Sequence, residues 1–174
     1  MELDRILSPE CTRFDLLATS KKRALELASE LLSTQFPELD AELVFDALMA
    51  RERLGSTAVG EGVAIPHCRT EGATRPVAAL LRLQEPVDFD APDDARVDLL
   101  LVLVVPAEEN DTHLQLLAAA ARMLSDAGCR RALRGADSDT AMFETALGAL
   151  DGTRDDAGGR PGGAAGVQAS RQAG

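Results

Sequence analysis

The stretch Val97-Asp-Leu-Leu-Leu-Val-Leu-Val-Val105 decides the fold class of this 174-residue chain. Apart from Asp98 it consists of Val and Leu, and Pro106 closes it. A run of this length without polar alternation is typical of a strand that is buried on both faces of a sheet. Such a strand needs a layer of helices on each side. The run therefore predicts a central sheet inside an α/β domain.

Helical periodicity before and after this strand indicates the covering layers. The predicted helices span residues 21–35, 40–54, 113–126, 129–134 and 138–150, and the predicted strands span 57–59, 63–65, 77–83 and 97–105. The helix over 40–54 is expected to face the core through Leu43, Ala47, Ala50 and Leu54, which recur at helical spacing. Because helices come in pairs between clustered strands, we expect an α/β fold with a mixed central β-sheet sandwiched between helices.

The composition changes after Leu150. Residues 151–174 contain seven of the 14 glycines and no Leu, Ile, Met or Phe. Such a segment buries too little apolar surface to offset the entropy that it would lose on ordering. We therefore expect one folded domain over residues 1–150 and a disordered Gly/Ala/Arg-rich tail over residues 151–174.

Charge and cysteine usage restrict the partners and the compartment. The formal net charge of −11 disfavours binding to the phosphate backbone of a nucleic acid. Three widely spaced cysteines imply no disulfide framework, which suits a reducing compartment. The first residues lack the basic and apolar parts of a signal peptide, and the longest apolar run is too short to cross a bilayer. We expect a cytoplasmic protein without nucleic-acid binding or direct membrane insertion.

The segment Gly60-Glu-Gly-Val-Ala-Ile-Pro-His67-Cys68 places one of the two histidines at the end of a predicted strand. Imidazole has an ordinary pKa of about 6.5, so at neutral pH much of it is unprotonated and nucleophilic. Attack on a phosphorylated donor would give a phosphoramidate, which is labile and can pass its phosphoryl group onward. Pro66 has a fixed φ and orients the residue that follows. His67 is therefore a candidate phosphoryl acceptor.

Two further side chains are candidates for stabilising a phosphate on His67. Thr112-His-Leu-Gln115 has the spacing of a capping box, which places His113 in the first turn of a helix. The positive end of the helix dipole attracts phosphate but disfavours imidazolium, so His113 would donate one hydrogen bond and no full charge. Arg51, near the end of a predicted helix, is a permanent cation. Periodicity alone leaves a purely structural role open for all three residues.

Other chemistries fit the sequence less well. Gly55-Ser-Thr-Ala-Val-Gly60 has the glycine spacing of a P-loop but continues with Glu61, where a phosphate-binding loop needs lysine. Neither CxxC nor HExxH occurs, so we expect no metal site and no cofactor. Cys68 as a nucleophile would need His113 as its base, because the adjacent His67 points to the other side of an extended chain.

The stretch from Glu52 to Cys68 resembles the phosphorylation-site signature of enzyme IIA domains of the fructose–mannitol class in the bacterial phosphotransferase system. In that signature an acidic or amide residue and six free positions precede an aliphatic residue, Gly and two further free positions. An aliphatic-Ala-aliphatic-Pro-His sequence and a small residue complete it. Every place is filled, by Glu52, Val59, Gly60, Val63, Ala64, Ile65, Pro66, His67 and Cys68.

The resemblance extends over residues 1–150 and is strongest to the nitrogen-regulatory type of the class. It includes Ile6-Leu-Ser-Pro9, Ser20-Lys-Lys-Arg23 and Cys129-Arg-Arg-Ala-Leu-Arg134. Cys68 is a departure, since many relatives have Gly after the histidine. The tail from Asp151 onward lies outside the family pattern. The resemblance implies the fructose/mannitol-type enzyme IIA fold.

The same resemblance implies a role for each candidate residue. His67 would be the phosphorylated residue, through its Nε2 atom, His113 would stabilise the phosphate, and Arg51 would be the supporting cation. The donor would be a histidine-phosphorylated carrier protein, itself phosphorylated by a phosphoenolpyruvate-dependent kinase. Regulatory target proteins would then respond to the phosphorylation state of the chain.

Two alternative functions remain open at this point. The chain could be a sugar-specific IIA component that passes phosphate to a fructose or mannitol permease. It could also be a docking regulator that never carries phosphate, which its acidic composition and small size permit. The regulatory target, the oligomeric state and the role of the tail are not encoded in a recognisable pattern.

Overall fold

The computed structural model describes residues 2–108 and 111–157. The strands are β1 Thr12–Leu16, β2 Ala58–Gly60, β3 Val63–Ala64, β4 His67–Thr70, β5 Val77–Val87 and β6 Val97–Pro106. The helices are α1 Lys21–Gln35, α2 Ala41–Leu54, α3 Asp111–Ser125, α4 Ala127–Arg134 and α5 Asp139–Ala157, and two short 3-10 turns span Leu3–Arg5 and Pro9–Cys11.

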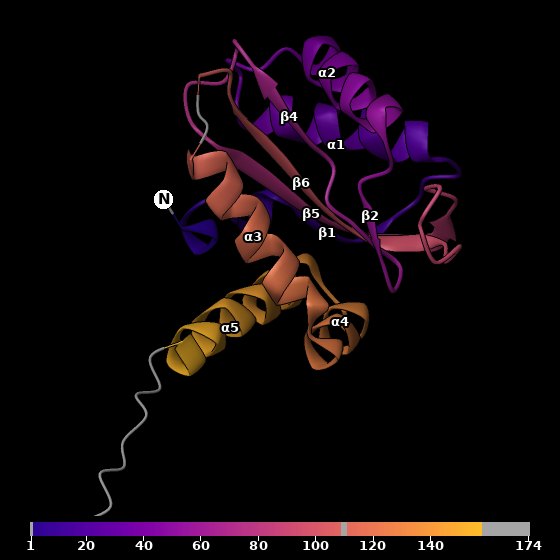
Figure 1. Ribbon diagram of the computed structural model, residues 1–174, viewed down its shortest axis with the longest axis vertical. Coiled ribbons are helices and arrows are strands. Elements are labelled where there is room, and N and C mark those ends of the chain that lie inside the picture. Colours follow the sequence, from indigo (N-terminus) through magenta and orange to yellow (C-terminus); the bar gives the residue numbers. More distant parts are fainter. Residues whose placement is uncertain (1, 109–110, 158–174) are drawn as a thin grey trace, which may run out of the picture.

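The strands form one six-stranded mixed sheet in the order β1-β5-β6-β3-β2, with β4 also paired to β6. The long strands β5 and β6 are antiparallel, while β1 runs parallel to β5, and β3 and β4 run parallel to β6. Helices α1 and α2 lie together on one face, and α3, α4 and α5 lie on the other (Figure 1). The predicted α/β sandwich with a mixed central sheet is confirmed.

Strand β6 is buried on both faces, as its sequence predicts. Leu100, Val102 and Val104 belong to the core cluster that includes residues of α1 and α2. The alternate residues Leu99, Leu101, Leu103 and Val105 belong to the cluster that includes residues of α3, α4 and α5. Because side chains alternate along a strand, one continuous apolar run supplies both cores.

The predicted buried face of helix α2 is wrong. The buried residues are Val44, Leu48 and Glu52. Leu43 and Leu54, predicted to face the core, are 59% and 85% exposed. The helix has two apolar stripes, and the one through Val44 and Leu48 meets the core.

Several element boundaries also differ from the prediction. Strands β1 and β4 were not predicted, since both are short and contain polar residues. Helix α3 begins at Asp111, so Thr112 lies inside the helix and is not its cap, although His113 is in the first turn as expected. Helix α5 continues to Ala157, past the boundary predicted at Leu150, so residues 151–157 are helical. The rest of the predicted tail, 158–174, lies outside the described residues.

Strands β3 and β4 share one register against β6, interrupted at Ile65 and Pro66. Val63 pairs with Leu99, and His67 pairs with Leu103. Between them, Pro66 has no N–H to donate to the sheet, but its carbonyl accepts from the Leu103 N–H at 2.9 Å. His67 is therefore the first residue of β4 and not the end of the preceding strand, and backbone hydrogen bonds fix its position.

Candidate functional site

The structure brings His67, His113 and Arg51 together, from three different elements. Helix α2 packs against β4, and its last turn carries Arg51. Helix α3 supplies His113, whose ring centroid is 5.2 Å from that of His67 at an interplanar angle of 82°. The three residues that the sequence singled out are thus neighbours at one end of β4.

Each ring nitrogen of His67 has a partner that can only donate or only accept a hydrogen bond. Nδ1 lies 2.8 Å from the carbonyl oxygen of Ile65, which can only accept a hydrogen bond. Nε2 lies 3.3 Å from Nε of Arg51, which can only donate. These two contacts require a proton on Nδ1 and a lone pair on Nε2. The geometry therefore selects the neutral tautomer in which Nε2 is the nucleophilic nitrogen.

His113 is buried, with 6% of its surface exposed. Its Nδ1 atom has no hydrogen-bond partner among the described residues. The imidazole is held instead by its edge-to-face contact with His67 and by its place in the first turn of α3. A buried, unpaired polar atom is costly and rare in native structures, and a catalytic role is one explanation for it.

Burial and positive charge lower the pKa of both histidines. For His67, burial is the main cause and the charges of Arg51 and Arg69 add to it, while the Ile65 carbonyl and the Glu52 carboxylate oppose it. For His113, burial again comes first, followed by the charges of His67 and Arg69. Because the ordinary pKa is about 6.5, a lowered pKa leaves both rings neutral at pH 7.

Arg69 belongs to the site but was missed by the sequence analysis. It lines a surface depression of about 590 Å³ together with His67, His113 and Arg51. It is two residues after His67 in β4, so both side chains lie on the same side of the strand. That spacing was the signal available in the sequence. The site therefore contains a second permanent cation.

The outer face of α2 forms an apolar rim at this depression. Ala47, Ala50 and Leu54 line it. Together with Leu43 they follow one face of the helix, the face that was predicted to be buried. An apolar surface beside charged groups is typical of a protein-binding surface.

The alternative nucleophile and a metal site receive no support from the geometry. Burial raises the pKa of Cys68 to about 12, so its thiol is protonated at neutral pH and is a poor nucleophile. Within residues 2–108 and 111–157, no three or more His, Cys, Asp or Glu side chains gather as metal ligands would. In the same part of the chain, no helix combines the length and apolar character that a membrane crossing requires.

Comparison with known proteins gives consistent relatives. The family model described as "Phosphoenolpyruvate-dependent sugar phosphotransferase system, EIIA 2" matches residues 5–147. A nitrogen regulatory protein of Pseudomonas aeruginosa is 44% identical over 152 residues, covering 87% of this chain and 99% of the relative. One of Escherichia coli is 42% identical over 158 residues, covering 90% and 96% of the two chains.

A solved structure agrees with these sequence relatives. The crystal structure of the nitrogen regulatory protein IIA-Ntr from Neisseria meningitidis superposes with a TM-score of 0.75 at 39% identity. The match covers 83% of this chain and 98% of that one. The chain belongs to the EIIA 2 family of the phosphoenolpyruvate-dependent sugar phosphotransferase system. The resemblance seen in the sequence is confirmed.

Proposed function

We propose that the chain is a phosphocarrier of the nitrogen-regulatory type, which accepts a phosphoryl group on Nε2 of His67 and signals by its phosphorylation state. The observation that carries the proposal is the pair of contacts on the imidazole, Nδ1 to the Ile65 carbonyl and Nε2 to Arg51. They put the proton on Nδ1 and the lone pair on Nε2, and His67 lines the surface depression. The names of the relatives support the regulatory role.

The transfer step is an exchange between two imidazoles. The Nε2 lone pair of His67 attacks the phosphorus of a phosphohistidine on the donor. The bond between phosphorus and the donor nitrogen breaks, and its electron pair stays on that nitrogen. The donor ring carries a proton on its other nitrogen, so it leaves as neutral imidazole. His67 keeps its Nδ1 proton on the Ile65 carbonyl throughout. In this proposal the donor is a histidine-phosphorylated carrier protein.

The surrounding groups supply positioning and charge neutralisation, which phosphoryl transfer requires most. The guanidinium of Arg51 already lies 3.3 Å from the nitrogen that would carry the phosphorus. His113 is neutral and donates one hydrogen bond to a phosphoryl oxygen. Arg69, from the same strand as His67, adds a second positive charge for the incoming phosphate.

The donor contacts the apolar rim of the depression. Ala47, Ala50 and Leu54 surround the approach to His67 with apolar surface. The phosphoryl group itself carries roughly −1.5 to −2 charges at this place. A target protein that binds the same apolar surface would therefore distinguish the two states of the chain by charge and by lost apolar contact.

A labelling experiment tests this function. The chain is incubated with radiolabelled phosphoenolpyruvate, the phosphoenolpyruvate-dependent kinase and the carrier protein. The wild-type chain should acquire a label that is acid-labile and stable to alkali, and mass spectrometry should place it on His67. The variant His67→Ala should not be labelled, whereas Cys129→Ser, a change in α4 away from the site, should be labelled like the wild type. A label that persists in His67→Ala refutes the assignment.

A sugar-specific role is the second candidate, because the matching family model describes a sugar phosphotransferase system. The same phosphorylated chain would then pass its phosphate to a permease. The test measures sugar phosphorylation by membranes that contain a fructose or mannitol permease. The phosphorylated carrier and this chain are added to these membranes. Sugar phosphorylation that depends on the chain favours the sugar-specific role, and its absence favours regulation.

A further inference from the structure

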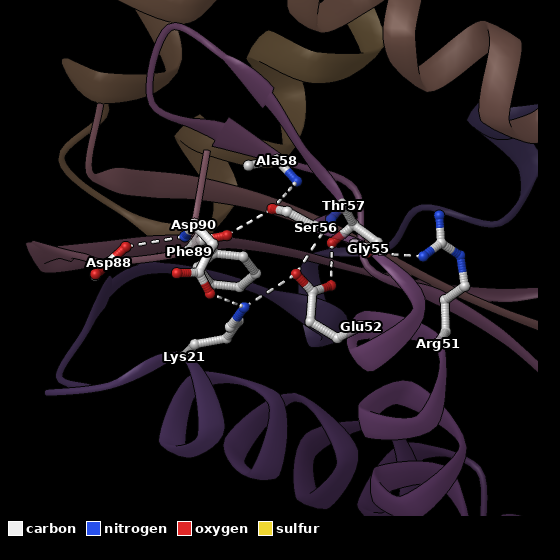
Figure 2. A network of polar contacts seen from close by, with 10 residues as sticks. All are labelled: Lys21, Arg51, Glu52, Gly55, Ser56, Thr57, Ala58, Asp88, Phe89 and Asp90. Atoms are coloured by element: carbon white, nitrogen blue, oxygen red, sulfur yellow. Dashed lines mark hydrogen bonds and ion pairs between the residues drawn. The ribbon is translucent and has the colours of Figure 1, made fainter. Parts of the chain in front are cut away.

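Glu52 is the acidic residue of the signature, and its carboxylate is buried. The side chain is 2% exposed. Its Oε1 atom accepts from the backbone N–H of Thr57 at 3.1 Å and lies 3.4 Å from Nζ of Lys21. Its Oε2 atom accepts from Oγ1 of Thr57 at 2.5 Å (Figure 2). Charge-assisted hydrogen bonds of this kind fix the position of both partners.

Lys21 compensates the buried negative charge. It is the first residue of α1, and its ammonium group also pairs with Asp90 at 2.9 Å and lies 5.4 Å from the ring centroid of Phe89. Burial alone would lower the pKa of Lys21, but the hydrogen bond to Asp90 and the charge of Glu52 raise it overall. The lysine is therefore charged, as a buried carboxylate needs its partner to be.

A short chain of hydrogen bonds connects Glu52 to the imidazole of His67. The carboxylate holds Thr57 through both its N–H and its hydroxyl group. The carbonyl of Thr57 accepts from the N–H of Ile65 at 3.0 Å. The carbonyl of Ile65 in turn accepts from Nδ1 of His67 at 2.8 Å. Two residues, Thr57 and Ile65, thus lie between the carboxylate and the ring, and their hydrogen bonds fix the position of the Ile65 carbonyl.

The partner of the other ring nitrogen depends on the same segment. Glu52 directly follows Arg51 in the last turn of α2, and its backbone carbonyl accepts from the N–H of Gly55 at 3.2 Å. The carbonyl of Gly55 accepts from Nη1 of Arg51 at 2.9 Å, as Figure 2 shows. Arg51 then reaches Nε2 of His67 with its Nε–H. The segment 55–57, which Glu52 holds at one end, therefore supports both contacts of the imidazole.

We propose that Glu52 is a positioning residue for His67, which acts through Thr57 and Ile65 to keep the proton on Nδ1 and the lone pair on Nε2. The inference rests on the proposed phosphoryl acceptance at Nε2 and adds the group that sets the tautomer. Glu52 does not touch the phosphate. Its part resembles that of the groups behind a metal-binding histidine, which orient the ring and fix its tautomer.

The first test compares Glu52→Gln with Glu42→Gln. The two changes remove the same charge from the same helix, but Glu42 is exposed. Imidazole ¹⁵N NMR on the unphosphorylated protein reports the tautomer and the pKa of His67. In Glu52→Gln, a population with the proton on Nε2 should become detectable, and the pKa of His67 should fall because the Glu52 charge that opposes burial is gone. The Glu42→Gln protein should match the wild type.

The second test keeps the charge and removes one bond of the chain. Thr57→Val retains the backbone N–H and the side-chain shape but loses the hydroxyl that donates to Oε2. Thr57→Ser retains the hydroxyl and serves as the matched rescue. Thr57→Val should change the His67 tautomer in the same direction as Glu52→Gln, and Thr57→Ser should restore the wild-type spectrum. This pair remains informative if Glu52→Gln does not fold.

Phosphorylation kinetics complete the experiment. The rate of phosphoryl acceptance should fall about 10- to 100-fold in Glu52→Gln, the range for groups that orient a functional histidine from behind. The pH profile of that rate should shift to lower pH together with the pKa of His67, since Arg51, Arg69 and His113 are not altered in the variant. A lower melting temperature with unchanged His67 signals and an unchanged pH profile would overturn the proposal, because Glu52 would then be only structural.

The NMR arm separates this inference from the proposed function. If the donor fails to phosphorylate the wild type while Glu52→Gln and Thr57→Val still alter the His67 tautomer, the proposed function fails and the positioning role stands. If the wild type is phosphorylated and neither variant alters the tautomer or the rate, the positioning role fails and the proposed function stands.

Discussion

Helix α2 and strand β6 both contain many apolar residues but place them in opposite ways. In β6, every residue from Leu99 to Val105 is buried. In α2, Leu43 and Leu54 are exposed, while the charged Glu52 is buried. Burying a leucine contributes about 1.5–3 kcal/mol, so α2 forgoes stabilisation that β6 obtains. The difference shows which element serves the core alone and which one also serves the site.

The exposed Leu54 and the buried Glu52 of α2 both lie next to the candidate site. The exposed Leu54 lines the depression that contains His67, and the buried Glu52 holds the segment on which Arg51 and His67 both rely. An exposed leucine forgoes apolar burial, and a buried charge loses its hydration and needs a compensating partner. Their occurrence within one turn, beside a histidine with a lowered pKa, is what a functional surface produces.

The largest expected effect is a difference in stability between two leucine-to-alanine variants, one in β6 and one in α2. Leu101→Ala in β6 should lower the free energy of unfolding by about 2–5 kcal/mol, because it leaves a cavity in a packed core. Leu54→Ala in α2 should change it by less than about 0.5 kcal/mol, as is usual for an exposed position. Chemical denaturation of both variants measures the difference. Comparable losses would show that α2 packs as originally predicted.

The second prediction concerns the guanidinium of Arg51. Arg51→Lys keeps the charge but loses the geometry that joins Nε2 of His67 to the carbonyl of Gly55. The rate of phosphoryl acceptance should fall on the order of 10²-fold, the usual result of a small misplacement. Rapid-quench kinetics with a phosphorylated carrier measures it. The control is Arg53→Lys, because Arg53 is an exposed residue of the same turn. An equal loss of rate in that variant would show that Arg51 has no specific role in phosphoryl acceptance.

The sequence predicted β6 better than α2 for a physical reason. A strand buried on both faces is apolar at every position, so the prediction does not depend on choosing which face is buried. Helix α2 contains one apolar stripe through Val44 and Leu48 and another through Leu43 and Leu54. Periodicity identifies a helix but does not say which stripe meets the sheet, since only the tertiary contacts decide that.

The sequence singled out neighbouring residues of the candidate site but did not give their full arrangement. His67, His113 and Arg51 were singled out from the sequence and lie together. Arg69 was missed, although its spacing from His67 was visible, and β4 was missed because four residues with three polar side chains give no strand pattern. The buried role of Glu52 depends on the nearby Thr57 and also on Lys21, whose approach comes from long-range packing that a local pattern does not contain.

The third prediction returns to Leu54, this time as part of the rim. Leu54→Ala should raise the KM for the phosphorylated carrier about three- to tenfold with little change in kcat, because it removes contact area from docking and nothing from the transfer step. Steady-state kinetics at varied carrier concentration measures it. Leu17→Ala, which shortens a leucine that is 59% exposed and does not line the depression, is the control. A fall in kcat alone would contradict a docking role.

The smallest effect concerns the stability of the site end of the molecule against pH. The pKa values of His67 and His113 are both lowered, chiefly by burial. Arg51 and Arg69 add to the lowering for His67, which the Ile65 carbonyl and Glu52 oppose, and His67 and Arg69 add to it for His113. As the pH falls below about 6.5, the unfolded chain therefore binds protons before the folded one does.

The free energy of unfolding should accordingly decrease on acidification, from about pH 6.5 until the pH passes below the folded pKa values. Denaturation curves between pH 7.5 and 5 check the sign. Carboxylates titrate mostly below this window, so the slope there belongs to the histidines. His113→Gln should flatten part of it and His67→Gln/His113→Gln most of it, while Leu101→Ala should lower the whole curve without flattening it. A stability that rises on acidification would mean that the site favours imidazolium, and His67 would then lack the free lone pair on which phosphoryl acceptance depends.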